Sequence, residues 1–286
     1  MRLLGLWLAC FFWAISFIAS KAALESAPPL TVAALRLIIA AACFLVWFAF
    51  KGWPKVASWR RIFFLSLVGT SLHYGTQTAG LQYTAASNAS LYAASAQIFI
   101  ALIAFFSLGE RLGARKVLGI LLASAGVLAA MGPKTLFSLE FRGHLLGDSL
   151  VLASLYLWAL FTVYGKRSSA EYGALHMLGL VTIVGAVTMI PAAGAELWWR
   201  GASLGAITPK SWLAIAFLGV SCSFLAALLY FLALERMESQ KVGVYLYTIP
   251  PMTYAAAWAL LGERFGWSLG IGSALVLAGV NLTERG

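Results

Sequence analysis

Apolar residues follow one another along this chain in runs of about 20, separated by short breaks that carry charged residues, proline or glycine. A transmembrane helix needs about 20 predominantly apolar residues, so each run predicts one span. The links between the runs have mostly 3–12 residues, so any function has to lie in the helices and at their ends. The ten predicted spans cover residues 3–24, 30–50, 60–82, 86–108, 113–131, 145–165, 173–193, 211–234, 241–261 and 266–283.

The first run also resembles a signal peptide, because Arg2 precedes an apolar stretch that continues to Ala19. However, the stretch WAISFIASK at 13–21 returns as WALFTVYGK at 158–166, with Trp, Ala and Lys in matching positions and a spacing of 145 residues. A segment with a counterpart later in the chain is not expected to be removed. We therefore interpret the first run as a span.

Two segments of the chain are close copies of each other, LGERLGARKVLGILLASAGV at 108–127 and LGERFGWSLGIGSALVLAGV at 261–280. At this spacing of 153 residues, 58–128 aligns with 211–281 without a gap, and about nineteen of the 71 positions are identical. The first span aligns at a spacing of 145 instead, which places an eight-residue insertion around 194–210. The sequence therefore predicts two copies of a five-helix unit.

The odd number of spans in each copy inverts the second copy relative to the first. The predicted fold is an all-α membrane protein of ten transmembrane helices, arranged as two inverted five-helix repeats at 1–136 and 143–286, with the LGER segments 109–112 and 262–265 on opposite faces. Inverted repeats are typical of transporters, whose two halves change conformation around a site near the midplane. A duplication that serves only folding is the alternative.

The composition supports the membrane interpretation. The 286 residues are 62% hydrophobic and 10% charged, whereas an average soluble domain is about a quarter charged. The net charge of +10 would suggest nucleic acid in a soluble protein, but the basic residues lie in short loops. With the N-terminus inside, the cytoplasmic segments hold 13 Lys and Arg and the outer ones six, so the positive-inside rule places both termini in the cytoplasm. The expected location is the bacterial inner membrane.

The sequence contains none of the patterns that indicate an enzyme or a metal site. It has no HExxH, no GxSxG, no paired aspartates inside a span and no Cys/His cluster. Cys10, Cys43 and Cys222 are scattered within apolar runs and are expected to serve packing. We expect no cofactor, no metal and no catalytic residue. A membrane-embedded enzyme and a channel remain as rivals, and the absence of an extramembrane domain argues against a sensor.

Several features of the repeat resemble one known family. The first helix contains Trp13 and ends in Lys21, the second carries Arg36 in AALRLIIAA, and 248–264 reads TIPPMTYAAAWALLGER before a glycine-rich last helix. This set resembles the EamA family of the drug/metabolite transporter superfamily and, within it, is similar to the YddG-type aromatic amino-acid exporters. The resemblance covers essentially the whole chain and implies an inverted-repeat transporter.

The chain departs from this pattern at two positions. Gln97 stands in the first copy where the second has Pro250, and Val181 lies in the second copy near the place that corresponds to Arg36.

Polar residues inside a span are costly and therefore mark candidate sites. In the third span, Thr70, His73 and Gln77 recur at helical spacing, and they either bind substrate or hydrogen-bond to a neighbouring helix. Their counterparts in the second copy are different residue types, and this asymmetry would suit a substrate with two chemically different ends. These counterparts are Ser223, Ala226 and Tyr230.

A second pair of stripes follows the i, i+4, i+7, i+11 pattern of one helix face. Asn88, Tyr92, Ser95 and Phe99 in the fourth span correspond to Lys241, Tyr245, Thr248 and Met252 in the ninth. Ordinary packing is the alternative, as it is for the two mid-span tryptophans. The residues expected to bind substrate are Trp13, Thr70, His73, Gln77, Asn88, Tyr92, Ser95, Trp158, Tyr230, Tyr245 and Thr248.

Prolines and small residues predict local features of the helices. Pro250 and Pro251 remove two backbone donors and predict a hinge, with a static kink as the alternative. Glu110 and Glu263 are expected to anchor helix ends beside Arg111 and Arg264. Small-residue stripes are expected to pack within the bundle, although they could also form a dimer seam, so we expect a monomer or a weak homodimer. The stripes are Gly266, Gly270, Ala274 and Ala278 in the tenth span, and Gly119, Ala123, Val127 and Ala130 in the fifth.

The charges inside the spans narrow the substrate class. Only Arg36 and Lys241 approach the expected cavity, both near helix ends, and no carboxylate lies mid-span. Phosphate esters would need several basic groups, so zwitterionic or neutral metabolites with apolar bodies are expected, amino acids including aromatic ones among them. His73 is the only embedded group that ordinarily titrates near neutral pH. Facilitated alternating-access transport is therefore predicted, with proton-coupled export as the alternative.

Overall fold

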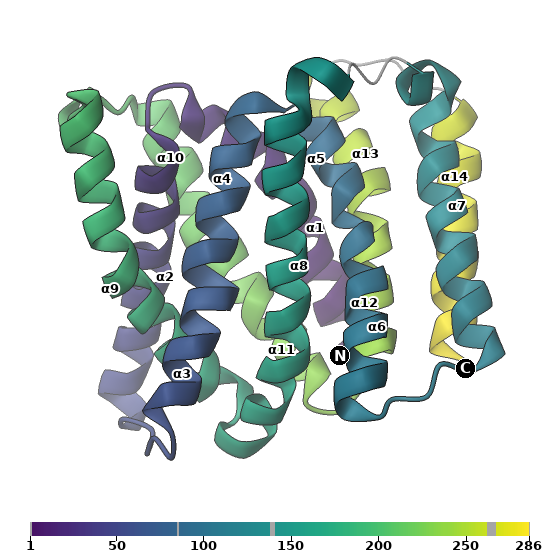
Figure 1. The fold of residues 1–286 in the computed structure, drawn as a ribbon, viewed down its shortest axis with the longest axis horizontal. Helices are drawn as coiled ribbons and strands as arrows, with labels where there is room; N and C mark the ends of the chain where they lie inside the picture. The colour runs from purple at the N-terminus through teal and green to yellow at the C-terminus, as the bar shows by residue number, and fades with distance from the viewer. Residues whose placement is uncertain (1, 85, 138–140, 262–266, 286) are drawn as a thin grey trace.

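The regular structure of this chain is helical throughout the part that the computed structural model describes, which comprises residues 2–84, 86–137, 141–261 and 267–285. The helices stand side by side in an upright bundle (Figure 1). The junction between the two predicted repeats contains residues 138–140, which lie outside the described residues.

In the part of the chain that the structure describes, ten helical rods run through the bundle, and four of them join two or three helical segments. The first five rods are α1 (Arg2–Leu24), α2 (Pro29–Lys51), α3 (Trp59–Ser66) with η1 (Leu67–Leu72) and α4 (His73–Tyr83), α5 (Ala86–Ala93) with α6 (Ser95–Leu108), and α7 (Ala114–Phe137). The next five are α8 (Phe141–Tyr172), α9 (Ala174–Arg200), α10 (Pro209–Phe217) with η3 (Leu218–Ala226) and α11 (Ala227–Leu234), α12 (Ser239–Gly243) with η4 (Val244–Thr248) and α13 (Ile249–Leu261), and α14 (Trp267–Glu284). A short 3-10 turn, η2 (Leu204–Ala206), precedes α10.

The number and the order of the predicted spans are confirmed, but three of them end later than expected. The fifth rod continues to Phe137, the sixth to Tyr172 and the seventh to Arg200, instead of ending at 131, 165 and 193. Pro191 lies inside α9 and does not end it. A single proline removes only one backbone hydrogen bond, and the helix continues until Gly201, whose φ of 61° terminates it.

The bundle has two faces. Figure 1 shows the N- and C-termini on the same face, which we call the terminal face; the other is the opposite face. Five stretches of the described chain are by themselves long and apolar enough to cross a membrane. Strongly exposed tryptophans occur near the rod ends, as in the aromatic belts of membrane proteins. They are Trp53 and Trp59 toward the terminal face and Trp198, Trp199 and Trp267 toward the opposite face.

The two halves of the chain interlock. The first rod, α1, packs along the eighth rod (α10, η3 and α11), and in the same way the sixth rod, α8, packs along the third rod. The second rod packs against the seventh, and α7 packs against α14. Each pairing is thus repeated with the halves exchanged, which is the arrangement expected of two copies related by a two-fold axis.

Glycines let α7 and α14 cross in close contact. A Cβ atom on Gly279 would lie 2.6 Å from the backbone N of Ala123 and from the backbone O of Gly119. A Cβ atom on Gly126 would lie 2.8 Å from the backbone O of Gly272. Since Gly119 corresponds to Gly272, and Gly126 to Gly279, the two close contacts are related by the repeat.

The tenth span, α14, therefore packs against α7 through a different face from the predicted one. Gly270, Ala274 and Ala278 are exposed, so the expectation that their stripe packs within the bundle is wrong. The packed face holds Gly272, Val276 and Gly279. In α7, the expected face is largely right, because Ala123 and Val127 are buried. Gly266 and the side chain of Ala130 lie outside the described residues.

This crossing gives a stability prediction. Gly279→Ala should destabilise the protein by about 1–3 kcal/mol, because overpacking against a backbone cannot be relieved by a side-chain rotation. Gly270→Ala is the matched control, since nothing lies within 4 Å of a Cβ at that position of the same helix. Thermal unfolding of both variants in detergent measures the difference. Equal melting temperatures would contradict the close crossing.

Candidate functional site

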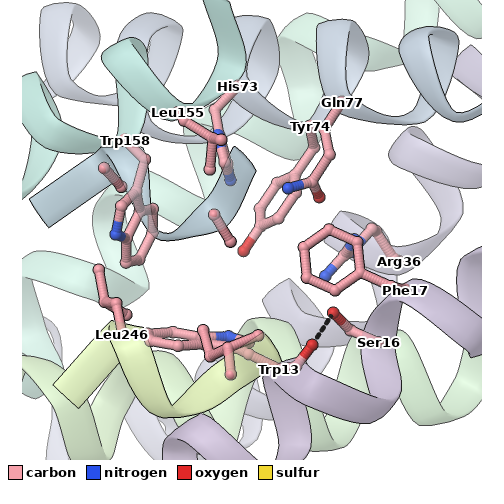
Figure 2. A pocket seen from close by; sticks show the side chains of 13 residues that line it. Trp13, Ser16, Phe17, Arg36, His73, Tyr74, Gln77, Leu155, Trp158 and Leu246 are labelled. Atoms are coloured by element: carbon pink, nitrogen blue, oxygen red, sulfur yellow. Dashed lines mark hydrogen bonds between the residues drawn. The ribbon is translucent and has the colours of Figure 1, made fainter. Parts of the chain in front are cut away.

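A cavity lies between the two halves, near the middle of the bundle. Figure 2 shows Arg36, Tyr74 and Gln77 on one side of it and Trp158 and Leu246 on the other. Eight helical segments contribute to the wall. The lining residues are Trp13, Ser16, Phe17, Arg36, His73, Tyr74, Gln77, Ala93, Ala96, Leu155, Trp158, Leu246 and Ile249. We call this space the central cavity.

The central cavity is narrow. The centres of water molecules can reach about 50 Å³ of it, which is room for a few waters. Counted along their helices, Trp13 and Ile249 lie near the middle, whereas Phe17, Arg36 and Gln77 lie nearer the opposite face. A larger molecule would therefore enter only after the walls have moved apart.

The third rod turns its polar residues toward the central cavity through an irregular segment. Its middle part, η1, is a π-helix over Leu67–Leu72, and the eighth rod has a π-helix in the corresponding place, η3. Wider π turns are rare and shift the face on which later residues lie. His73, Tyr74 and Gln77 follow directly after η1 and line the cavity.

His73 is fixed in orientation by one hydrogen bond and two rings. Its Nδ1 lies 2.8 Å from the backbone O of Ser154 on α8; because a carbonyl only accepts, Nδ1 donates. The imidazole centroid is 4.6 Å from that of Tyr74 and 5.3 Å from that of Trp158. Nε2 is thus the nitrogen that remains available to a ligand.

An aromatic cluster closes the central cavity toward the terminal face. The centroids of Trp13 and Trp158 are 5.2 Å apart, and Tyr230 lies 5.2 Å from Trp13 and 5.7 Å from Trp158. Phe161 and Phe231 continue the cluster. Tyr230 is the repeat counterpart of Gln77. A large ring therefore stands in the second half at the position where the first half has the smaller Gln77 side chain beside the cavity.

Arg36 lies on the cavity wall. It is one of the two basic residues expected to approach the cavity, and it sits about two turns from the start of α2 and is 2% exposed. Its Nε donates to Ser223 Oγ at 2.9 Å. Ser223 belongs to η3, so the pair joins the second rod to the eighth.

Four of the eleven predicted site residues line the central cavity, namely Trp13, His73, Gln77 and Trp158, and Tyr230 packs beneath it. The others have different surroundings. Thr70 Oγ1 donates to Ser66 O and packs against Gly185 of α9, while Ser95 Oγ donates to Tyr92 O. Tyr92 lies beside Asp148. The side chain of Asn88 lies outside the described residues.

The predicted stripe of the ninth rod is also turned away from the central cavity. Tyr245 OH donates to Glu284 at 3.1 Å, and the Tyr245 ring packs edge-on against Trp7. Thr248 Oγ1 donates to Tyr245 O within the same rod. The wall receives Leu246 and Ile249 from this rod instead.

The fourth and ninth rods both break near the central cavity. In the ninth, the 3-10 segment η4 runs up to Ile249, directly before Pro250 and Pro251. In the fourth, the helix is interrupted at Ala94 although this copy has no proline there. Gln97 stands in place of Pro250, and its Nε2 donates to Gln240 O at 2.9 Å. Each rod therefore has its interruption at the corresponding position.

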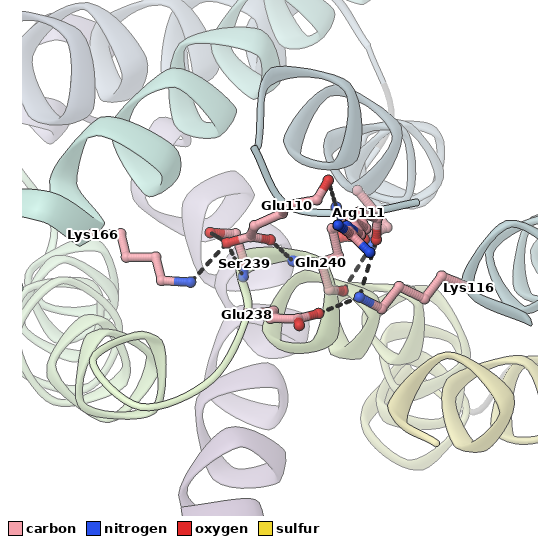
Figure 3. A network of polar contacts seen from close by, with 8 residues as sticks. Glu110, Arg111, Lys116, Lys166, Glu238, Ser239 and Gln240 are labelled. Atoms are coloured by element: carbon pink, nitrogen blue, oxygen red, sulfur yellow. Dashed lines mark hydrogen bonds and ion pairs between the residues drawn. The ribbon is translucent and has the colours of Figure 1, made fainter. Parts of the chain in front are cut away.

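A polar network joins the rods at the terminal face (Figure 3). Glu110 follows Gly109, whose φ of 68° ends α6. Its carboxylate accepts from Lys166 Nζ at 2.7 Å and from the backbone N and Oγ of Ser239 at 3.0 Å each. As expected, Glu110 anchors a helix end, but this is the start of α12, and the charge partner is Lys166 rather than Arg111. Lys116 and Glu238 form a second ion pair beside it.

These donors change the acidity of Glu110. Burial alone would raise the pKa of this carboxyl, but Lys166 and the Ser239 donors together hold the pKa below its ordinary value. Glu263, the corresponding residue of the second LGER segment, lies outside the described residues.

Sequence reasoning missed several lining residues. Ser16 and Phe17 follow Trp13 at i+3 and i+4, the spacing of one helix face, so the tryptophan itself pointed to them. Tyr74 directly follows His73. Leu155, Leu246 and Ile249 carry no signal that separates them from ordinary core residues.

The chain matches known proteins over nearly its whole length. The family model described as "EamA-like transporter family" matches residues 2–132 and 145–284. An "Uncharacterized transporter" of Archaeoglobus fulgidus is 31% identical over 281 residues, which cover 96% of this chain and 94% of that protein. The "Probable amino-acid metabolite efflux pump" of Escherichia coli is 26% identical over 294 residues, covering 96% and 91%.

A solved crystal structure has the same fold. It superposes with a TM-score of 0.82 at 20% identity and covers 99% of this chain and 97% of that chain. At this identity the likeness concerns the fold alone.

Proposed function

The chain belongs to the EamA-like transporter family, and on that premise we propose that it exports small metabolites, amino acids including aromatic ones, by alternating access around the central cavity. The matched family and relatives are named as transporters, so the chain is a multi-pass membrane transporter rather than an enzyme. The amino-acid part of the proposal rests on the printed name of the Escherichia coli relative and on the cavity wall.

The composition of the wall is the observation that carries the substrate proposal. Trp13, Phe17, Tyr74 and Trp158 supply aromatic surface, and His73 and Gln77 supply hydrogen-bonding groups. Small-molecule sites are typically apolar hollows with a few polar groups. A single basic residue on the wall suits an amino acid better than a phosphate ester, whose charge would need several.

Alternating access is supported by the difference between the two sides of the central cavity. Toward the terminal face, the aromatic cluster and the Glu110 network tie the rods together. Toward the opposite face lie Phe17, Arg36 and Gln77. In the proposed cycle the two halves exchange these roles, so that the closed side opens and the other side packs.

The proposed location is the bacterial inner membrane, with both termini in the cytoplasm. The excess of Lys and Arg in the segments on the side of the termini, 13 against six, supports this orientation. The terminal face is then the cytoplasmic one.

Counterflow in proteoliposomes tests the proposed function. Purified protein is reconstituted into vesicles loaded with unlabelled phenylalanine, and labelled phenylalanine outside should accumulate transiently, as only a carrier with alternating access allows. When a panel of unlabelled amino acids and one nucleotide sugar is tested, only the amino acids should compete with labelled phenylalanine. Saturable movement of the nucleotide sugar alone would contradict the proposal, and flux without counterflow would indicate a channel.

The driving force is proposed to be the substrate gradient. Among the lining residues no Asp or Glu occurs, and proton-coupled carriers usually rely on an embedded carboxylate. The same vesicles with and without an imposed pH gradient provide the measurement. If concentrative uptake requires the pH gradient and disappears in His73→Ala, transport is coupled to protons and the proposed driving force is wrong.

Pro250 and Pro251 are proposed as the hinge of the ninth rod. The double change to alanine restores donors that can bond to the carbonyls of Leu246 and Tyr247, which would turn η4 into regular, stiffer α-helix. Turnover should then slow more than substrate binding weakens. Pro191→Ala in α9 is the matched control, because Pro191 lies inside a helix away from the central cavity. Unchanged turnover in the double variant would mean that the two prolines form only a static kink and not a hinge.

A further inference from the structure

Arg36 is a buried cation on the wall of the central cavity, and it has no described counter-ion. It is the only charged residue among the lining residues. None of the ion pairs between described residues includes it. An arginine side chain stays protonated in proteins, so this positive charge is permanent.

The groups around Arg36 hold it in place without neutralising it. Nε donates to Ser223 Oγ at 2.9 Å, and the guanidinium carbon lies 4.0 Å above the ring centroid of Tyr74. Nη1 is enclosed and has no hydrogen-bond partner among the described residues. A buried charge with an unused donor is costly to the protein by itself, and a site that binds an anion would retain it.

The geometry points to Arg36 as the group that binds the carboxylate of the transported solute. Guanidinium and carboxylate match each other in shape and form charge-assisted hydrogen bonds, and the contacts with the Tyr74 ring and with Ser223 hold the guanidinium in place. We propose that this makes the substrates organic monocarboxylates with an apolar body, in which the carboxylate is required and the α-amino group is not. This inference rests on the proposed transport function.

The other residues of the cavity wall explain why the amino group of a solute should contribute less to binding than its carboxylate. An ammonium would find no carboxylate there, because no Asp or Glu is among the lining residues. In its neutral form the His73 ring offers it one lone pair at Nε2, since Nδ1 is engaged with Ser154 O. Trp13, Phe17 and Trp158 surround the apolar body of the solute.

Four matched solutes test the inference on the wild-type protein. They share one phenyl group and differ in charge: phenylalanine, 3-phenylpropionate without the amino group, phenethylamine without the carboxylate, and phenylalaninamide with the carboxylate neutralised. Competition against labelled phenylalanine in counterflow is measured, together with the rise in melting temperature that each solute causes in detergent. Phenylalanine and 3-phenylpropionate should compete, and the two compounds without a carboxylate should be weaker by about tenfold or more, as expected for hydrogen bonds to a charged group.

Variants at Arg36 then connect the preference to this residue. Arg36→Gln should abolish the discrimination between phenylalanine and its amide, and Arg36→Lys should keep part of it, because a lysine retains the charge but not the planar fork. Arg61→Gln is the control, since Arg61 lies in a half-exposed ion pair with Glu171 outside the cavity. The ratio between the two solutes is the readout, and a purely structural role of Arg36 would leave that ratio unchanged.

The outcomes separate the two proposals. If none of the four solutes competes or stabilises, the proposed amino-acid function fails. If phenethylamine competes as well as 3-phenylpropionate, or if Arg36→Gln keeps the wild-type ratio, transport stands and the carboxylate site is wrong. Should Arg36→Gln fail to fold, the wild-type series still decides, because it requires no substitution.

Discussion

Replacing Glu110 by alanine should lower the stability of the protein more than the loss of any exposed ion pair. The side chain is 9% exposed and accepts from Lys166 and from the start of α12, so its removal leaves both without a partner. Breaking a buried pair in this way costs about 3–5 kcal/mol, and we expect the lower end because Lys166 is 22% exposed. Glu110→Gln should cost less, since it keeps one acceptor oxygen.

Thermal unfolding in detergent measures this effect, and Glu25→Ala is its control. Glu25 pairs with Lys210, but the two side chains are 54% and 65% exposed, so the expected loss is about 0–1 kcal/mol. A similar melting temperature for both variants would show that the Glu110 network contributes little to the folded state.

The pH dependence of stability follows from the same contacts. Because the pKa of Glu110 is lowered in the folded protein, its contribution is fully present above the ordinary glutamate value of about 4.3. It is lost as the pH falls through the lower folded-state pKa. The wild-type protein should therefore lose more stability on acidification in this range than Glu110→Ala, and parallel curves would contradict the assignment.

The number and the order of the rods could be predicted from the length and the hydropathy of the apolar runs. An apolar run of about 20 residues has few alternatives in a membrane, and the LGER copies revealed the repeat. The end of the seventh span near Pro191 could not be predicted in this way. A proline can interrupt a helix or lie inside it, and only the packing of α9 decides which.

The candidate site was harder to predict, because the stripes assumed 3.6 residues per turn throughout. The π segment η1 breaks that period between Thr70 and His73, so the first packs against α9 and the second faces the central cavity. The 3-10 segment η4 has the same consequence for Tyr245. Arg36 illustrates a different limit, since its position in the sequence does not show that Ser223 of η3 and Tyr74 of α4 contact it.

Replacing Trp158 by alanine should abolish measurable transport. The side chain is 6% exposed and contacts the rings of Trp13, His73 and Tyr230, so truncation opens a void in both the cavity wall and the aromatic cluster. Losses of about 3–5 kcal/mol are typical for a buried tryptophan. Transport per folded molecule is the quantity to measure, with the folded fraction determined by gel filtration. Trp199→Ala is the matched control, because Trp199 is 87% exposed.

Trp13→Ala provides the second half of this test. Trp13 and Trp158 are counterparts in the repeat, and Trp13 Nε1 also donates to Cys222 O at 3.2 Å, which joins α1 to η3. If the two halves exchange roles during transport, each tryptophan lies on the closed side once in every cycle, so both variants should impair influx and efflux alike. A variant that slows one direction while the other stays normal would mean that the tryptophans do not have equivalent roles. Normal rates per folded molecule in both variants would instead place the aromatic cluster in the static core, because a wall that moves around the substrate cannot lose its largest ring without effect.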